Sequence, residues 1–216
     1  MVDNGNGVSS LPPLEVGIGL RCNDFVMLMA DTRIYQQILT DSVERDKITP
    51  LGNGTLLMCL GGSGPLFSRI VSTGMSLHKL VSATQHSVQR TPRIIGQTMQ
   101  DIRRQNNHGD PLDLHIMLGT ADPTTGVTLY KGDPYGFMLE VPYAYIGING
   151  FLTASLVDKY YKPDLTVQEA YSVLKQCVHH MKRRTVLSYP KFTVKVLDRT
   201  GTVNVLPDLK YSDFKV

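Results

Sequence analysis

The run Phe25-Val-Met-Leu-Met-Ala30 is apolar at every position, and this constrains the fold more than any other feature. A strand with one face in water alternates apolar and polar residues, whereas a strand without polar residues is covered on both faces. The sequence therefore predicts a sheet with another layer packed on each side. The preceding segment, Val16–Arg21, alternates large apolar residues with glycines and an arginine, and Asn23-Asp24 supplies the turn between two paired strands.

The remaining periodicities place strands in blocks and helices in pairs. We expect strands at 15–22, 25–33, 55–60, 112–120, 127–131, 136–147, 192–197 and 202–206, and helices starting at Pro65, Pro92, Asn149 and Thr166. This order indicates an α+β domain rather than alternating βαβ units. We expect residues 1–13 to be a flexible N-terminal extension and residues 14–216 to form a single domain.

Three local signals give specific predictions. Thr166-Val-Gln-Glu169 is a capping box, which opens a helix. The buried stripe of that helix is predicted to be Ala170, Val173, Leu174, Cys177, Val178 and Met181. Pro142 indicates an edge position or a bulge in its strand, and Asn149 is predicted to cap a helix that continues through Tyr161.

Composition excludes several classes of function. The net charge is only +3 and the basic residues are scattered, so no nucleic-acid partner is expected. No segment is long and apolar enough to span a membrane. The spacing of the six histidines along the chain does not match that of metal ligands, so no metal is expected. These histidines are His78, His86, His108, His115, His179 and His180. The glycines at 61–64 lack the Gly-Lys-Ser/Thr ending of a phosphate loop, and no cofactor is expected.

The cysteines and the N-terminus indicate a reducing compartment. Cys22, Cys59 and Cys177 are odd in number and widely spaced, which favours small buried side chains over disulfides. Residues 1–10 are polar and resemble neither a secretory signal nor a transit peptide. We therefore expect the protein in the cytoplasm and nucleus.

Five segments together resemble the proteasome β-subunits. They are Ala30-Asp-Thr-Arg33, Asp46-Lys-Ile48, Cys59-Leu-Gly-Gly62, Val157-Asp-Lys-Tyr-Tyr161 and Arg184-Thr-Val-Leu-Ser-Tyr-Pro190. The resemblance runs from about Leu14 to about Leu209, and it is strongest to members at the non-catalytic β4 position (beta type-2). It implies that residues 14–216 form a proteasome β-type domain: a four-layer αββα sandwich of the N-terminal-nucleophile hydrolase type.

The resemblance also assigns positions to individual residues. Active members use an N-terminal threonine, assisted by an aspartate and a lysine that match Asp31 and Lys47, and an oxyanion glycine that matches Gly61. Glu15 occupies the place of the threonine, and Thr185 occupies the place of a supporting aspartate, beside the matching serine Ser188. These positions are therefore read as vestigial, and no catalytic residue is expected.

The chemistry of the replacement supports this interpretation. A nucleophile must form a labile acyl intermediate and needs a nearby base, whereas Glu15 has no hydroxyl and is preceded by fourteen residues. A carboxylate beside Lys47 is expected to form an ion pair. Asp31 and Lys47 are likewise expected to form a partly buried ion pair that joins two strands.

The resemblance implies a structural subunit of the eukaryotic 20S proteasome, within an assembly that degrades proteins in an ATP- and ubiquitin-dependent manner. The implied partners are β3- and β5-type lateral neighbours, α-ring subunits and the opposite β-ring. Met29 and the Ile34-Tyr35 loop are candidates for lining a neighbour's pocket. Two alternatives stay open: a hydrolase that exposes Ser9, Ser10 or another nucleophile after processing, and a free-standing homo-oligomer.

Overall fold

A computed structural model describes residues 13–36, 39–52, 54–61, 64–83, 88–106 and 112–214 of the chain. The predicted extension therefore lies outside the described residues, except for Pro13. Ser9, Ser10, Gly62, His86 and His108 also lie outside them, as do the side chains of Tyr35 and His78. The boundary between extension and domain stays a prediction.

Two antiparallel five-stranded sheets form the centre of the molecule. The first sheet has the order β10-β1-β2-β11-β12 and the second has the order β5-β6-β7-β8-β9. The strands of the first sheet are β1 (Gly17–Arg21), β2 (Phe25–Asp31), β10 (Tyr143–Ile146), β11 (Lys191–Asp198) and β12 (Val203–Lys210). Those of the second are β5 (Ile48–Gly52), β6 (Thr55–Gly61), β7 (Leu114–Asp122), β8 (Gly126–Gly132) and β9 (Met138–Glu140).

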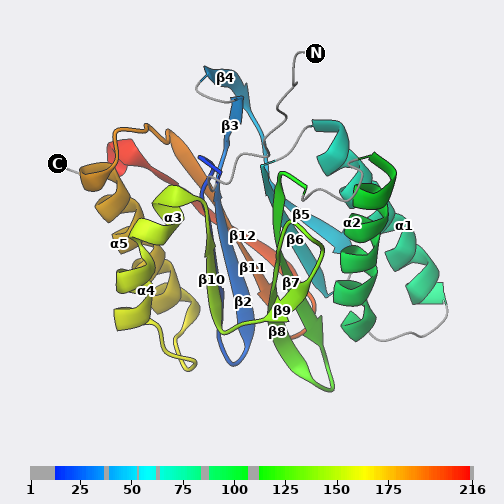
Figure 1. Cartoon of the computed structure of the whole chain (residues 1–216). Coiled ribbons are helices and arrows are strands. Elements are labelled where there is room, and N and C mark those ends of the chain that lie inside the picture. Colours follow the sequence, from blue (N-terminus) through cyan, green and yellow to red (C-terminus); the bar gives the residue numbers. More distant parts are fainter. Residues whose placement is uncertain are drawn as a thin grey trace, which may run out of the picture.

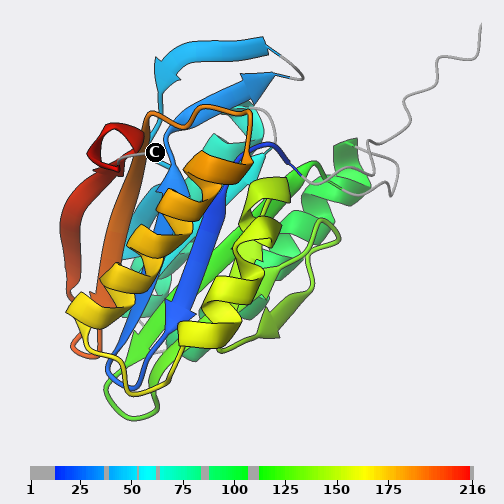
Figure 2. The ribbon, with the colours of Figure 1, turned by 90° about the vertical axis from the view of Figure 1, so that its left-hand side faces the viewer.

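Helices cover the outer face of each sheet, so the chain forms four layers (Figure 1). Helices α1 (Gly64–Ala83) and α2 (Thr91–Asn106) pack on the second sheet. Helices α3 (Ile148–Leu152), α4 (Ala154–Tyr160) and α5 (Val167–Arg184) lie on the side of the first sheet (Figure 2). The predicted αββα sandwich is confirmed.

Two further features lie outside the layers. A two-stranded hairpin of β3 (Arg33–Gln36) and β4 (Leu39–Glu44) projects from one end of the sandwich (Figure 2). It was not predicted as a separate sheet. Single turns of 3₁₀ helix, η1 (Val88–Arg90) and η2 (Tyr211–Asp213), complete the elements.

Strand β2 has the double-sided burial that its composition predicts. All seven residues of Phe25–Asp31 are buried. Val26, Leu28 and Ala30 face the layer between the sheets, whereas Met27 and Met29 pack with the apolar stripe of α5. Met29 is fully buried, so the expectation that it lines a neighbour's pocket is wrong.

Helix α5 begins and packs as predicted. The Thr166 side chain accepts a hydrogen bond from the Glu169 amide at 3.3 Å, and Glu169 accepts from the Thr166 amide at 2.8 Å. The six residues of the predicted stripe are the buried residues of the helix. Local chemistry therefore fixes where this helix starts, and its apolar face fixes which side meets the sheet.

Two expectations about residues 136–161 are wrong. The single strand predicted there is two strands, β9 and β10, which are edge strands of different sheets. Pro142 lies in the link between these two strands and belongs to neither of them, so the predicted continuous strand is wrong. Asn149 is a buried residue inside α3 rather than a cap, because Gly147 precedes the helix with a φ of 86°. Thr153 then separates α3 from α4.

Removing the capping box is expected to destabilise the fold without altering the site described below. Thr166→Ala should lower the free energy of unfolding by about 1 kcal/mol, because the Glu169 amide loses its acceptor. Thermal unfolding of the full chain measures the loss. Thr166→Ser, which keeps the hydroxyl, should stay close to the parent chain, and equal losses in both variants would contradict the capping explanation.

Candidate functional site

Four residues singled out by the sequence meet at one end of the sandwich. Glu15 comes just before β1, and Asp31 ends β2, the strand that pairs antiparallel with β1. Lys47 immediately precedes β5, and Gly61 ends β6 in the second sheet. The cluster of Glu15, Asp31, Lys47 and Gly61 therefore spans both sheets, and its members come from strand ends, where side chains leave the closely packed core.

Lys47 is the centre of this cluster. Its Nζ atom lies 3.0 Å from each carboxylate oxygen of Asp31 and 3.3 Å from Oε2 of Glu15. It also donates to the carbonyl oxygen of Arg33. The Lys47 side chain is 2% exposed, so one buried cation is shared by two carboxylates. The predicted ion pairs of Lys47 with Asp31 and with Glu15 are both confirmed.

Asp31 also joins the strands around it. Its Oδ1 accepts the Val16 amide at 2.7 Å and its Oδ2 accepts the Arg33 amide at 3.1 Å. The pKa of Asp31 is raised to about 6: burial is the largest cause and the Glu15 charge adds to it, while Lys47 and the Val16 amide act in the opposite direction. Desolvation therefore outweighs the attraction of Lys47, and Asp31 takes up a proton more readily than an exposed aspartate.

The Gly61 amide donates a hydrogen bond to Oε2 of Glu15 at 2.7 Å. Gly61 has a φ of 75°, which L side chains rarely adopt, and a Cβ there would lie 3.0 Å from the Asp113 carbonyl oxygen. This turn aims a backbone N–H at the end of β6, where it is suited to hold an anion. In this chain that anion is the side chain of Glu15, which also pairs with Lys47.

The backbone on either side of Glu15 is held in place. Its carbonyl lies so close to Gly147, which has a φ of 86°, that a Cβ on that glycine would lie 1.8 Å from the oxygen. Upstream, the Pro13 carbonyl accepts the Ile148 amide at 3.1 Å. The Leu14 carbonyl accepts the Tyr189 hydroxyl at 2.6 Å. Glu15 is therefore fixed by contacts before and after it.

Tyr189 was missed as a site residue by the sequence reasoning. It is fully buried, accepts a hydrogen bond from the Asn149 side chain, and its pKa is raised by burial. Its position in the Arg184–Pro190 segment, which was singled out for its resemblance, is the signal that pointed to it. Its role here is to link the end of α5 to the segment before β1.

Thr185 does not join the cluster through a hydrogen bond in the described part of the chain. It follows α5, and its hydroxyl accepts the Leu187 amide at 2.8 Å. Ser188 is exposed in the same loop. The structure thus brings together Glu15, Asp31, Lys47 and Gly61, while the Thr185 hydroxyl bonds within its own turn.

Other candidate chemistry lies elsewhere. The three cysteines are buried, as predicted, and burial raises the pKa of Cys22 to about 11 and those of Cys59 and Cys177 to about 12. Across the described residues, no group of three or more His, Cys, Asp or Glu side chains is arranged to hold a metal ion. None of the described helices has the length and apolar character needed to cross a membrane.

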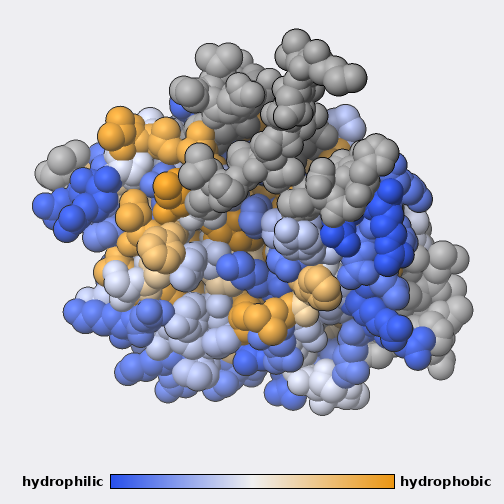
Figure 3. All heavy atoms as spheres, in the orientation of Figure 1, coloured by the Kyte–Doolittle hydropathy of each residue, from blue (hydrophilic) through white to orange (hydrophobic). Residues whose placement is uncertain are grey.

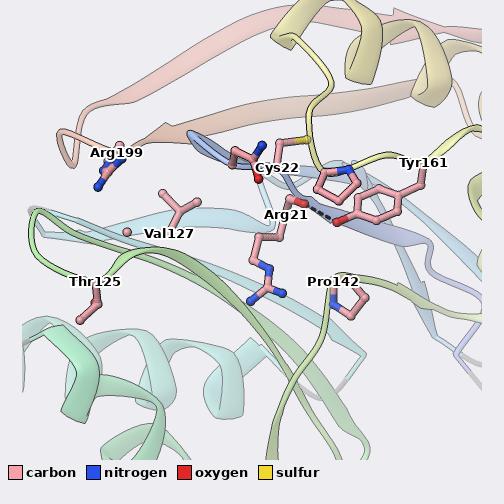
Figure 4. A pocket seen from close by; sticks show the side chains of 10 residues that line it. Arg21, Cys22, Thr125, Val127, Pro142, Tyr161 and Arg199 are labelled. Atoms are coloured by element: carbon pink, nitrogen blue, oxygen red, sulfur yellow. Dashed lines mark hydrogen bonds between the residues drawn. The ribbon is translucent and has the colours of Figure 1, made fainter.

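A cavity of about 360 Å³ lies at the other end of β1 (Figure 4). Arg21 and Arg199 stand on different sides of it, and the Tyr161 hydroxyl donates to the Arg21 carbonyl at 2.6 Å. Arg21 is already paired with Glu140 at 2.5 Å. The cavity therefore does not add a reactive group to the Glu15 cluster.

Comparison with known proteins gives a consistent result. The family model described as "Proteasome subunit" matches residues 16–197. The chain is 26% identical over 191 residues to "Proteasome subunit beta type-4" of Saccharomyces cerevisiae, covering 87% of this chain and 95% of the relative. It is 25% identical over 190 residues to "Proteasome subunit beta type-2" of Oryza sativa subsp. japonica, covering 87% and 88%. The corresponding match to "Proteasome subunit beta type-2" of Trypanosoma brucei brucei is 29% identical over 203 residues, covering 88% and 97%.

Removing the shared cation is expected to be severely destabilising. Lys47→Met should cost roughly 3–5 kcal/mol of unfolding free energy, because two buried carboxylates lose their counter-charge. Chemical unfolding of the full chain measures this loss. Adding Glu15→Gln should recover part of it, since one of the two anions is removed. An equal or larger loss in the double variant would argue against a shared cation.

The pH dependence of the free energy of unfolding should reflect the titration of Asp31. Its folded-state pKa of about 6 lies above the ordinary 3.8, so the folded chain binds this proton more tightly. The stability that Asp31 contributes is therefore complete below the lower value and is lost as the pH rises through the higher one. Relative to Asp31→Asn, which cannot titrate, the parent chain should gain stability as the pH falls from about 6 toward 4. Thermal unfolding of both proteins across this range is the measurement. A relative loss on acidification would mean that Lys47 keeps Asp31 ionised.

Proposed function

The chain belongs to the proteasome subunit family, and we propose that it is a non-catalytic, β4-type subunit of the eukaryotic 20S core particle. The relatives described above carry the names beta type-2 and beta type-4, and each match covers most of both chains. Membership of the family implies assembly with other proteasome subunits. The finer assignment, to a position without peptidase activity, rests on the chemistry of Glu15.

One observation carries the proposal: the Gly61 amide is bonded to the Glu15 carboxylate at 2.7 Å. A hydrolase of this kind needs a hydroxyl or thiol nucleophile and a free amide to stabilise the developing oxyanion. Glu15, at the expected nucleophile position, has neither a hydroxyl nor a thiol. Its carboxylate already accepts the hydrogen bond of the Gly61 amide. Lys47 is at the same time neutralised by two carboxylates. A single residue at position 15 therefore removes the nucleophile, occupies the oxyanion donor and adds a second carboxylate to Lys47.

The proposed role is structural. The subunit would complete a β-ring between β3- and β5-type neighbours, contact the α-ring on one side and meet the second β-ring on the other. It would hold catalytic neighbours in register, while the assembly carries out ATP- and ubiquitin-dependent degradation. The proposed location is the cytoplasm and nucleus.

An exposed apolar surface supports a role in assembly. Figure 3 shows apolar atoms gathered over α3 and the loop after α5, at the upper left of the molecule. The exposed large side chains in this region are Ile148, Phe151, Leu152 and Val186, with exposed fractions from 40% to 104%. Apolar surface of this kind is typical of protein–protein contacts.

The proposal is tested by treating the native assembly with an electrophilic peptide warhead and measuring the intact mass of every subunit. We expect catalytic subunits to gain the mass of the reagent and this chain to stay unmodified. We also expect its mass to include residues upstream of Glu15. A mass that begins at Ser9, Ser10 or another hydroxyl or thiol residue, or a covalent adduct on this chain, would favour the alternative hydrolase.

A variant at position 15 distinguishes the effect of the missing hydroxyl from the effect of the missing free amine at the same residue. Glu15→Thr restores the hydroxyl, but its nitrogen stays in a peptide bond to Leu14. We therefore expect no gain of peptidase activity from this variant in the assembly.

The size of the native complex in a cell extract tests the third hypothesis, because a free-standing homo-oligomer would contain this chain alone.

A further inference from the structure

A cavity of about 260 Å³ opens between the edge strand β10 and strands β7 and β8 of the other sheet. Its wall is mainly apolar and includes Tyr145, Ile146 and Phe151. Two groups with ionisable nitrogen atoms, His115 of β7 and Lys131 of β8, also line it. The cavity is therefore an apolar recess with a basic wall.

The register of the second sheet explains why these two side chains share the recess. Lys131 pairs with Met117, and His115 is two residues before Met117 on the same strand. Side chains two apart on a strand, and those of directly paired residues, point to the same face of a sheet. Met117 lies in the core between the two sheets. His115 and Lys131 therefore face the first sheet, at the place where β10 forms its edge.

Lys131 differs from the other buried lysines of the protein. Lys47 and Lys195 are each paired with carboxylates, at 3.0 Å from Asp31 and 2.5 Å from Asp46. Lys131 is half-buried, and within the described residues its side-chain amine forms neither an ion pair nor a hydrogen bond. Its nearest aromatic contact is the Tyr145 ring, whose centroid lies 5.5 Å from Nζ. Burial lowers the pKa of Lys131.

His115, the second basic residue of the recess, also has a lowered pKa. Asp113 and Asp133 raise the pKa of His115, but burial and the charge of Lys131 lower it, and the result is a pKa below the ordinary value. At neutral pH the imidazole is therefore mainly uncharged. The recess presents an amine that loses its proton unusually easily, beside a neutral imidazole and an apolar wall.

We propose that Lys131 is a reactive amine and that its cavity takes an uncharged apolar aldehyde, which becomes attached as an imine. The lone pair of Nζ attacks the carbonyl carbon, and the carbonyl oxygen takes up a proton to give a carbinolamine. Nζ gives up both of its protons, one to the carbonyl oxygen as the carbinolamine forms and one as the hydroxyl leaves as water, so the C=N bond forms with no net release of protons. No oxidant or reductant is consumed. Desolvation in an apolar pocket is an established way for a lysine to become nucleophilic. This inference does not rest on the proposed function.

The test uses the full chain separated from other subunits, because Phe151 in the wall of the recess also belongs to the apolar surface proposed for assembly. The protein is incubated at neutral pH with benzaldehyde and cyanoborohydride, which traps imines as stable secondary amines, and the labelled lysines are identified by peptide mass mapping. Lys159 and Lys175 are the matched controls, because they are exposed but also lie near aromatic rings, at 5.0 and 4.8 Å. We expect Lys131 to react several-fold faster than either control, because burial in the apolar recess favours the uncharged, nucleophilic form of its amine.

Two variants keep the test decisive. Lys131→Arg should lose the adduct at this position while Lys159 and Lys175 react as before. Phe151→Ser removes part of the apolar wall at a side chain that is 65% exposed, so folding should be unaffected. It should slow labelling at Lys131 only. Reaction at Lys131 no faster than at Lys159 would overturn the proposal, and so would a preference for Lys131 that Phe151→Ser leaves unchanged.

Discussion

The buried Lys47 cation is the interaction on which the end of the sandwich depends. It lies between the first sheet, which supplies Glu15 and Asp31, and the second sheet, in which β5 follows it directly. A buried ion pair is weak evidence of net stability, because desolvation offsets much of the attraction. Its consequence is specificity: once Lys47 is buried, both carboxylates must be within reach, and this sets how the ends of β1, β2 and β5 lie relative to one another.

Glu15 links this electrostatic constraint to function. A backbone N–H at a strand end suits a short-lived oxyanion as well as a permanent carboxylate, because both are hydrogen-bond acceptors with negative charge. In this chain the permanent anion is built in, and it satisfies the Gly61 amide and the Lys47 cation together. The arrangement proposed here therefore retains the geometry of a hydrolytic site while using it to hold two sheets together. Contacts that would stabilise a transition state in a hydrolytic site then stabilise the folded state of this chain.

Much of the fold was predictable because short-range chemistry determined it. The Phe25–Ala30 run required two covering layers, and the Thr166–Glu169 box fixed the start of α5, as found. The break between β9 and β10 was not predictable, because both are short edge strands and only their pairing with different sheets separates them. Asn149 was misread for a related reason: an asparagine before a helix is typical of a cap, but here its side chain bonds to Tyr189, forty residues away. The residues of the site were named from the resemblance and the pairing of Glu15 with Lys47 was predicted, whereas the hydrogen bond from the Gly61 amide to Glu15 required the three-dimensional structure.

Lys47 and Lys131 show how the same side chain acquires different chemistry from its surroundings. Both belong to the second sheet or its immediate approach; Lys47 is buried and Lys131 is half-buried. Lys47 meets two carboxylates and a backbone carbonyl, so anions are buried together with it. Lys131 meets an aromatic ring and a neutral imidazole, so burial acts against its charge. A lysine's reactivity thus depends less on burial itself than on whether an anion is buried with it. The ion-paired cluster at Glu15 and the proposed reactive recess beside β10 follow from that one difference.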